Sequence, residues 1–317
     1  MQTATVAICT HDRAASLPWA AERALGEARA CGAEVLIVDN ASTDSTPDLL
    51  AALTRDAAPT LRAVQEPCLG LSAARNRALA EASAEVVAFL DDDAVPRPGW
   101  LAALLGPFSA GAACVGGRIV LRYPAARPAW LTPALEVTLG AHDLGPGGGY
   151  SPGEHPRGGN VAFRVATARA LGGFSTRMGL RGRHQLQHEE TDLCARIARA
   201  GGTIAYAHDA VVEHTVFPER LTPQWFLERQ WQHGQSAAIY ELRNHGLRRA
   251  LGWLRWHHRP NLGVARYVPR EPIDPVRLLA EVRRREALGY LVGLLRGIPR
   301  LPSLRRDACV PAGSQRA

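Results

Sequence analysis

The sequence predicts an α/β fold, with a mixed, mostly parallel sheet flanked by helices and a helical C-terminal extension. Strand-like and helix-like segments alternate through the first third of the 317 residues, as in folds with a parallel sheet. Polar residues directly follow three of these strands, where ligands bind in such sheets. After about residue 222 the pattern becomes helical and basic. An apolar content of 46% fits a globular chain with a sizeable core.

The alternation in the first third defines four strands. Each is a short apolar run bounded by turn residues, and the segments between them have helical spacing. Pro47 stands in the first turn of one predicted helix, where its missing N–H costs nothing. The expected strands are 5–10, 34–39, 61–65 and 86–90, and the expected helices are 15–30, one from Pro47, and 71–83.

From Gly116 the pattern changes. Residues 121–159 are rich in proline and glycine without clear periodicity, which is typical of a binding loop or lid. An amphipathic helix is expected at 189–200, stopped by two glycines. A strand at 160–165, a helix at 166–172, and either two strands or one broken strand at 203–206 and 210–214 complete this part.

Three regions follow from these patterns. These regions are residues 1–115, residues 116–222 of the same domain, and a basic helical extension at 223–317. In the extension, apolar residues recur at i, i+3, i+4 and i+7 between arginines, which indicates a helix packed on the domain or, alternatively, a peripheral membrane contact. The recurring residues are Leu288, Leu291, Val292 and Leu295.

Composition excludes several classes of protein. No lysine occurs, so all 37 basic residues are arginine, and P-loop, pyridoxal-phosphate and protein-kinase sites are excluded. The net charge of +7 comes largely from arginines after residue 240 that are not interleaved with aromatics, so nucleic acid is not an expected partner. The six cysteines are scattered, which fits a reducing cytosol. With no signal-like N-terminus, the expected location is cytoplasmic, or peripheral at the inner face of the membrane.

The strand at 86–90 runs directly into Asp91, Asp92 and Asp93. Adjacent carboxylates are costly unless positive charge lies among them. Two carboxylates at a strand end are suited to Mg²⁺ or Mn²⁺, which would in turn hold a diphosphate. Since no glycine-rich phosphate loop follows a strand, arginines such as Arg13 or Arg75 are expected to assist the metal.

Four segments in unbroken order resemble the donor half of family 2 glycosyltransferases, which have the Rossmann-like GT-A fold. They are TVAICTHDR, VLIVDNASTDST, GLSAARNRALAEA and VAFLDDDAVPRPGWL. The resemblance continues through RGGNVAFRV, ALGGFSTRMGLRG, HEETDLCARIARAGG and AYAHDAVVEHT, over roughly residues 4–217. It implies that residues 1–115 are the donor-binding half of one domain and 116–222 its acceptor-binding and catalytic half. The implied donor is a nucleoside-diphosphate sugar, with UDP, GDP or dTDP left open, and the acceptor is a hydroxyl of unknown identity.

The resemblance assigns roles position by position. Asp93 is the expected metal ligand at one end of the DxD motif, Asp91 matches the other end, and either Asp91 or Asp92 lies nearer the ribose. His214 matches a late histidine that often completes the metal sphere in this fold. The remaining donor-side positions are Thr10 and Arg13 on the first strand, Asp39 and Asn40 near the base, Arg75 near the nucleotide, and Gly159 and Asn160 beside the sugar.

The general base falls in HEETDL. The family commonly has Glu-Asp at the positions of Glu189 and Glu190, so Glu190 is the expected base, with Asp192 as the alternative. The implied reaction is an inverting transfer of a sugar, in polysaccharide, glycolipid or natural-product glycosylation. Competing interpretations are a non-catalytic sugar-nucleotide binder, a membrane-docked assembly protein, a pyrophosphorylase and a haloacid-dehalogenase-type phosphohydrolase; the last needs an aspartate where Cys9-Thr10 stand.

Overall fold

The computed structural model describes residues 3–151, 153–181, 184–185 and 187–300. Within them, eight strands form one sheet in the order β3-β2-β1-β4-β7-β6-β10-β5, and two short strands form a separate hairpin. The strands of the sheet are β1 (Ala4–Thr10), β2 (Glu34–Asp39), β3 (Leu61–Gln65), β4 (Val86–Asp91), β5 (Ala94–Pro96), β6 (Ala112–Arg122), β7 (Asn160–Arg164) and β10 (Thr203–Thr215), and the hairpin is β8 (Leu180–Arg181) with β9 (His184–Gln185).

The first four strands run parallel, as predicted from the alternation of strand and helix. β1 pairs with β2 on one side and β4 on the other, and β3 extends the sheet beside β2. β7 runs antiparallel between β4 and β6, while β6 and β10 are parallel to each other. The sheet is therefore mixed and mostly parallel, which confirms the predicted fold class.

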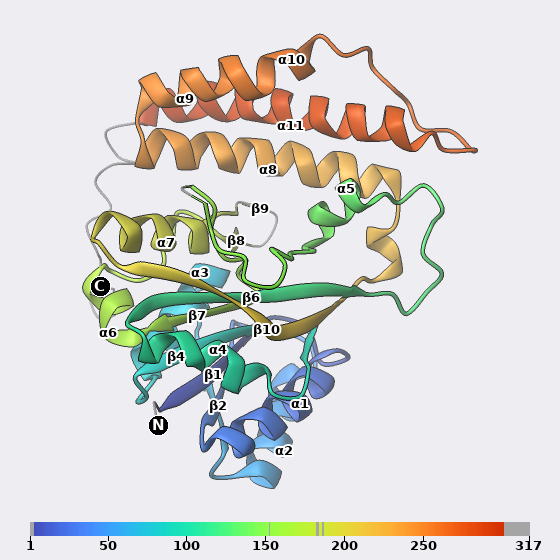
Figure 1. The fold of residues 1–317 in the computed structure, drawn as a ribbon. Helices are drawn as coiled ribbons and strands as arrows, with labels where there is room; N and C mark the ends of the chain where they lie inside the picture. Colours follow the sequence, from blue (N-terminus) through green and yellow to red (C-terminus); the bar gives the residue numbers. More distant parts are fainter. Residues whose placement is uncertain (1–2, 152, 182–183, 186, 301–317) are drawn as a thin grey trace.

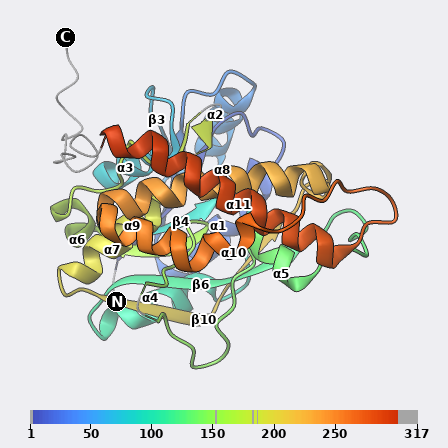
Figure 2. The ribbon, with the colours of Figure 1, turned by 90° about the horizontal axis from the view of Figure 1, so that it is seen from above.

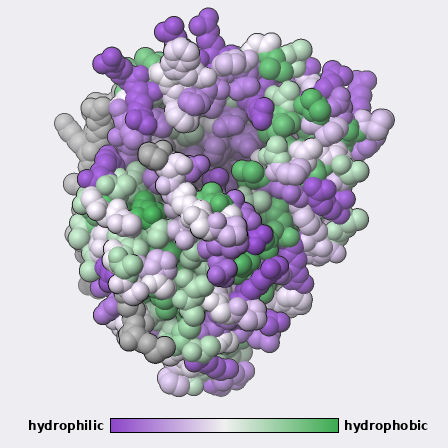
Figure 3. Space-filling view, viewed as in Figure 1, coloured by the Kyte–Doolittle hydropathy of each residue, from purple (hydrophilic) through white to green (hydrophobic). Residues whose placement is uncertain are grey.

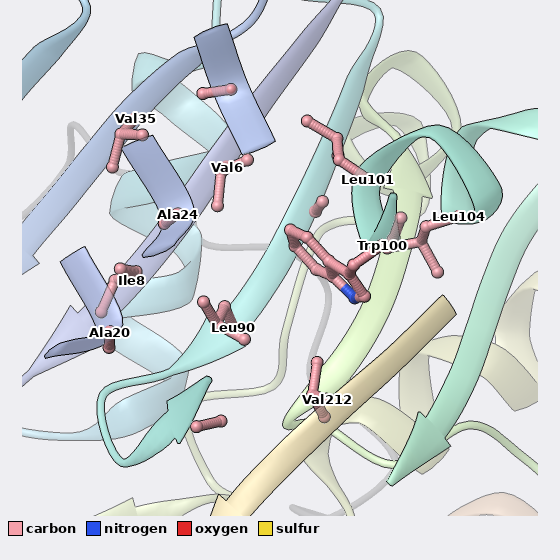
Figure 4. Close-up of a cluster of buried hydrophobic side chains, with 14 of the residues drawn as sticks. Val6, Ile8, Ala20, Ala24, Val35, Leu90, Trp100, Leu101, Leu104 and Val212 are labelled. Carbon is pink, nitrogen blue, oxygen red and sulfur yellow. The ribbon is translucent and has the colours of Figure 1, made fainter. Parts of the chain in front are cut away.

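Helices cover both faces of the sheet (Figure 1). Alternate residues of each buried strand face opposite layers, as the two-residue period of a strand requires: Val6 and Ile8 pack toward one layer and Ala7 toward the other. Figure 4 shows the first layer, with Trp100 beside Leu90 and Val212. That layer holds α1 (Leu17–Cys31), α2 (Thr46–Ala57) and α4 (Trp100–Ser109), and the other holds α3 (Leu71–Glu81), α6 (Val165–Ala170) and α7 (Glu189–Arg199).

The second half of the sheet contains elements that the sequence patterns did not separate. The predicted boundary between residues 115 and 116 falls inside β6, in the middle of the continuous sheet. β10 is a single strand with an irregularity between Ala207 and Val211, which decides between the two alternatives for 203–214. The loop at 121–159 includes two short helical turns, α5 (Pro133–Glu136) and η1 (Val137–Leu139).

The C-terminal helices form a further layer on the side of the sheet that carries α7 (Figure 1), and Figure 2 shows α11 running across this layer. Buried apolar side chains of α5, η1, α8 and α11 form a common cluster, which fixes the layer to the rest of the fold. No helix in the described ranges is apolar over a length that would traverse a bilayer. The layer consists of α8 (Pro223–Asn244), α9 (Leu247–Trp253), η3 (Leu254–His258), α10 (Arg259–Leu262) and α11 (Pro275–Gly297).

α11 packs on the domain, as the first of the two alternatives for this helix predicts, but the predicted apolar stripe is only partly its packed face. Tyr290 and Leu294 are the buried side chains, whereas Leu295 of the predicted stripe is 63% exposed. The physical reason is close helix packing: a Cβ on Gly289 would lie 2.1 Å from the carbonyl oxygen of Trp231 in α8. Since the contact face is built on glycines, it has no apolar side chains at those positions for a pattern to detect.

Candidate active site

A cleft of about 980 Å³ lies at the carboxyl ends of β1, β2 and β4, beneath α8. The first strands place Thr10, Asn40 and the three aspartates at this edge, as expected for a parallel sheet. The facing wall comes from the C-terminal layer and includes Trp225, Glu228, Arg229, Gln230, Gln232 and His233 of α8 and Glu286 of α11.

Each of the three adjacent aspartates faces a different partner. Asp91 Oδ1 lies 3.6 Å from Arg75 Nη2. Asp92 Oδ2 accepts a hydrogen bond of 2.8 Å from the Thr10 hydroxyl, and Asp92 Oδ1 lies 4.0 Å from Arg13 Nε. Basic side chains of the protein therefore compensate part of the repulsion for which the sequence interpretation invoked a metal ion.

Asp93 is held by two groups. Its Oδ1 lies 3.2 Å from His214 Nε2, and its Oδ2 accepts a hydrogen bond of 3.1 Å from Arg220 Nη2. Burial alone would raise the pKa of Asp93, but the hydrogen bond and charge of His214, together with Arg220, outweigh it and lower the pKa to about 2. Asp92 behaves oppositely, because burial and the charge of Asp93 raise its pKa to about 7. Asp93 is therefore the more firmly ionised carboxylate of the two.

The side chains at Asp93 supply part of the ligand set that a hard divalent cation needs. No group of three or more histidine, cysteine or acidic side chains converges on one point in the described ranges. Asp93 and His214 nevertheless supply an oxygen and a nitrogen that face each other. A Mg²⁺-type site needs only one or two such protein ligands when a diphosphate and water complete the sphere. Asp93 and His214 are thus the residues that would hold the ion.

Arg75 connects the aspartates to the acidic start of α7. Its side chain is buried, with the guanidinium 5.7 Å from the ring centroid of Phe89 and 5.6 Å from that of Phe174. Its Nη1 donates a hydrogen bond of 2.6 Å to Glu189 Oε1. Burial and the neighbouring charge of Glu190 raise the pKa of Glu189 to about 7, although Arg75 opposes this shift. Arg75 fixes Glu189 against the floor of the cleft.

The three acidic residues of α7 are separated by the helix. Glu190 lines the cleft without a hydrogen bond or ion pair to any described residue. Asp192 is fully buried and outside the cleft lining, where its carboxylate meets Arg196, Arg243 and Asn244. The structure therefore brings Glu190 to the site and places Asp192, the alternative base, in a structural ion-pair network.

The Gly-Gly-Asn segment contributes backbone rather than the asparagine side chain. Gly159 lies so close to Asp91 that a Cβ there would be 2.5 Å from Oδ2. Asn160 is fully buried and absent from the cleft lining. Its Oδ1 accepts from Trp100 Nε1, and its Nδ2 donates to the carbonyls of Arg118 and Ala210. The side chain predicted to lie beside the sugar instead ties three strands and α4 together.

The end of β2 also divides its roles. Asp39 is buried, does not line the cleft, and accepts a hydrogen bond from Ser42 N. Asn40 lines the cleft while its side chain fixes the backbone of Glu66, Cys68 and Gly70. Asn40 therefore lines the cleft, whereas Asp39, the residue before it in the sequence, is buried outside the cleft lining.

Sequence reasoning missed several cleft residues. Arg220 lies six positions beyond His214, outside the recognised motifs, and reaches Asp93 only because η2 (Pro218–Arg220) turns the chain back. The others come from the loop at 121–159, the segment just before α7 and the C-terminal layer, where no motif marks them: Arg157, Gln187, Arg229, Gln230, His233 and Glu286. The family resemblance also implies that residues 181–183 line the acceptor side or close over the donor, and residues 182 and 183 of this segment lie outside the described residues.

Comparison with known families identifies the first half of this arrangement. The model of glycosyl transferase family 2 matches residues 5–172. A glucosyl-dolichyl phosphate glucuronosyltransferase of Haloferax volcanii is 27% identical over 55% of this chain and 56% of that protein. The succinoglycan biosynthesis protein ExoM of Rhizobium meliloti is 30% identical over 68% of each chain. A pre-mycofactocin glycosyltransferase of Mycobacterium tuberculosis is 33% identical, but the match spans only 36% of its length.

Solved structures share the fold at low sequence identity. A mannosyltransferase from Pyrobaculum calidifontis, in complex with GDP-Man and Mn²⁺, superposes with a TM-score of 0.53 and 21% identity over 97% of this chain and 76% of its own. GalNAc-T7 with UDP, GalNAc and Mn²⁺ superposes with a TM-score of 0.59 and 16% identity over 94% of this chain and 57% of its own. These likenesses extend over the C-terminal layer as well as the sheet.

Proposed function

The chain belongs to glycosyl transferase family 2, and from this premise we propose that it transfers a sugar from a nucleoside-diphosphate donor to an acceptor hydroxyl with inversion. The observation that carries the proposal is the cleft itself. It contains Glu190, whose carboxylate has no hydrogen-bond or ion-pair partner among the described residues, in the same cavity as Asp93 and His214. A base and a diphosphate site are the two parts that such a transfer needs.

The donor diphosphate is expected at Asp93 and His214. Two proteins that share the fold are bound to Mn²⁺ and a nucleotide or nucleotide sugar, which supports Mg²⁺ or Mn²⁺ as the cofactor of this chain. A divalent cation held there would neutralise negative charge on the diphosphate as it leaves. Arg220 and Arg13, at the same edge, would add positive charge from the protein.

Glu190 is the proposed general base. Its carboxylate takes the proton of the acceptor hydroxyl, and the oxygen attacks the anomeric carbon from the face opposite the diphosphate. The bond from the anomeric carbon to the diphosphate oxygen breaks, and its electron pair leaves with the nucleoside diphosphate. Arg75 serves as a positioning residue, because its ion pair with Glu189 fixes the first turn of α7 next to the acceptor.

A screen for stabilising donors tests the proposal. Melting temperatures are measured with UDP-, GDP- and dTDP-sugars, each with and without Mn²⁺, and stabilising donors are then assayed for slow hydrolysis. A ligand at 100 times its dissociation constant stabilises the folded state by about 2.7 kcal/mol. We expect one nucleotide to stabilise the protein more with Mn²⁺ than without it, and its sugar to be released. Binding without turnover would identify a non-catalytic binder, and stabilisation by none would refute the proposal.

We also propose that the C-terminal layer contacts anionic membranes. Trp256 in η3 is 73% exposed and Leu251 in α9 is 46% exposed. The exposed arginines Arg248 and Arg255 lie on the same two short helices, and exposed Arg259 begins the next one, α10. The Arg255 guanidinium lies 5.3 Å from the Trp256 ring centroid. In Figure 3 this upper layer is mainly hydrophilic with separate hydrophobic spots. Such a surface suits an interfacial contact held by charge and a few inserted side chains.

Vesicle sedimentation tests this contact. Vesicles of phosphatidylglycerol with phosphatidylcholine are expected to bind the protein more strongly than phosphatidylcholine alone. Trp256→Ser should weaken that binding about tenfold, as expected for losing one large buried apolar group. Trp19→Ser is the matched control, because Trp19 is 58% exposed but lies on α1, in the opposite helical layer. Equal binding to both vesicles, or equal losses in both variants, would contradict the contact.

A further inference from the structure

Two arginines that line the cleft form no ion pair with a carboxylate of any described residue. Five arginines line the cavity, and three of them are paired: Arg13 with Asp92, Arg75 with Glu189 and Arg220 with Asp93. The side chains of Arg157 and Arg229 form no ion pair or hydrogen bond with any residue in the described ranges. The cleft thus contains two guanidinium groups whose hydrogen-bond donors are not engaged by any described residue.

These two arginines lie on opposite walls of the cleft, and the charges of both act on the same residue, His188. Arg229 lies on α8, one turn before His233. Arg157 directly precedes the glycines whose backbone lies against Arg75 and Asp91. Burial, His233 and the charges of Arg157 and Arg229 together lower the pKa of His188, the residue that caps the start of α7. Both guanidinium groups therefore lie on the side of the cleft where the N-terminus of α7 presents Glu190.

The surroundings favour an anionic ligand group. Desolvation and the charge of Arg220 lower the pKa of Arg229, although Glu189 and Glu190 oppose the shift. The guanidinium fork matches a carboxylate or phosphate with two parallel hydrogen bonds. Beside it, Gln187 Nε2 and Gln230 Oε1 are buried with no hydrogen-bond partner among the described residues, as groups that await ligand hydroxyls would be.

We propose that Arg157 and Arg229 form a second anion site in the cleft, separate from the diphosphate site at Asp93, that binds a phosphate or carboxylate group of a substrate. The inference rests on the proposed function and specifies a chemical class of substrate for it, one that carries an anionic group. Because Glu190 and Arg229 line the same cleft and their charges interact, the anion lies near the acceptor hydroxyl that attacks the anomeric carbon. Its source is either an acceptor that carries a phosphate or carboxylate, or a donor whose sugar is a uronic acid.

Inorganic phosphate is the first probe, since it requires no knowledge of the substrates. Calorimetry on the full chain is expected to give phosphate binding that Arg157→Gln and Arg229→Gln each weaken by about tenfold or more, as for the loss of a charge-assisted hydrogen bond. Arg229→Lys should retain part of the affinity, which separates loss of charge from a folding defect. Arg55→Gln, an exposed arginine on α2, is the matched control and should change nothing.

Phosphate binding as strong in both glutamine variants as in the unaltered protein would overturn the proposal. So would a loss of phosphate binding in Arg220→Gln alone, because the anion would then occupy the diphosphate site. This arm needs no nucleotide sugar, so it remains decisive even if the proposed glycosyl transfer fails its own test.

Donor hydrolysis without acceptor identifies the source of the anion. UDP-glucose and UDP-glucuronate, or the equivalent pair on the nucleotide that binds, are compared in the Arg157→Gln and Arg229→Gln variants. A KM raised about tenfold for the uronate alone assigns the anion to the donor sugar. Unchanged KM values for both donors, combined with weakened phosphate binding, assign it to the acceptor. Equal increases in KM for both donors would overturn the proposal, because the arginines would then serve the diphosphate.

Discussion

Replacing Glu190 with glutamine is expected to reduce turnover by about 10²- to 10⁴-fold, the range that a positioned general base contributes. The substitution retains the size of the side chain and removes its ability to accept a proton. Glu190 lies in the cleft without a partner in the described chain, so no structural ion pair is lost. Donor affinity should therefore remain unchanged. Hydrolysis of the stabilising nucleotide sugar gives the rate, and calorimetry gives the affinity.

Glu228→Gln is the matched control for this prediction. Glu228 lines the same cleft from α8 and is exposed, so its replacement removes one negative charge without removing the proposed base. Its turnover should stay near that of the unaltered protein. Full activity in the Glu190 variant would assign the base elsewhere. Glu189 would be the next candidate, since the buried carboxylate of Asp192 is already engaged by Arg196 and Arg243.

Replacing Asp93 with asparagine is expected to remove the metal dependence of donor binding. Asp93 supplies the ionised oxygen opposite His214, and its lowered pKa of about 2 leaves it charged at neutral pH. Loss of an outer-shell partner of a bound metal typically costs 10- to 100-fold in affinity, so loss of a direct ligand should cost at least about 100-fold. Calorimetric affinity for the nucleotide sugar, with and without Mn²⁺, measures the change. Asp93→Ala should behave in the same way.

Asp92→Asn provides the contrast. The pKa of Asp92 is raised to about 7, and its carboxylate already accepts a hydrogen bond from Thr10. Asparagine can accept the same bond, so nucleotide affinity can fall modestly while the difference that Mn²⁺ makes persists. If the Asp93 variant kept the full effect of Mn²⁺, or the Asp92 variant lost it, the assignment of the metal ligand would be incorrect.

The mostly parallel sheet and the edge at which the cleft lies could be predicted because their signals are local. Four apolar runs separated by helical segments indicate a parallel sheet, and polar residues after the strands indicate which edge binds ligand. The structure brings Thr10, Arg13, Asn40 and the aspartate triplet together at that edge. It also places Gly159 and His214 there, although their positions in the chain are distant from the triplet.

Side-chain partners could not be predicted, because they depend on elements that meet only in space. Asn160 follows a recognisable motif, yet hydrogen bonds to Trp100, Arg118 and Ala210 fix its side chain in the core. Asp192 carries the same carboxylate chemistry as Glu190, but it lies outside the cleft lining and its carboxylate is engaged by Arg196 of α7 and by Arg243 and Asn244 of α8.

The sequence by itself determined a mixed α/β sheet of the family 2 type, with carboxylates at the end of its fourth strand and acidic residues at the start of α7. Hydrophobic periodicity and turn residues encode these features within a few neighbouring positions. Only the tertiary structure decided which carboxylate and which arginines of the cleft have no hydrogen-bond or ion-pair partner among the described residues. It also decided that α8 and α11 pack through glycines and cover the cleft. Charge compensation and close packing depend on distances between segments far apart in the chain, which no local pattern records.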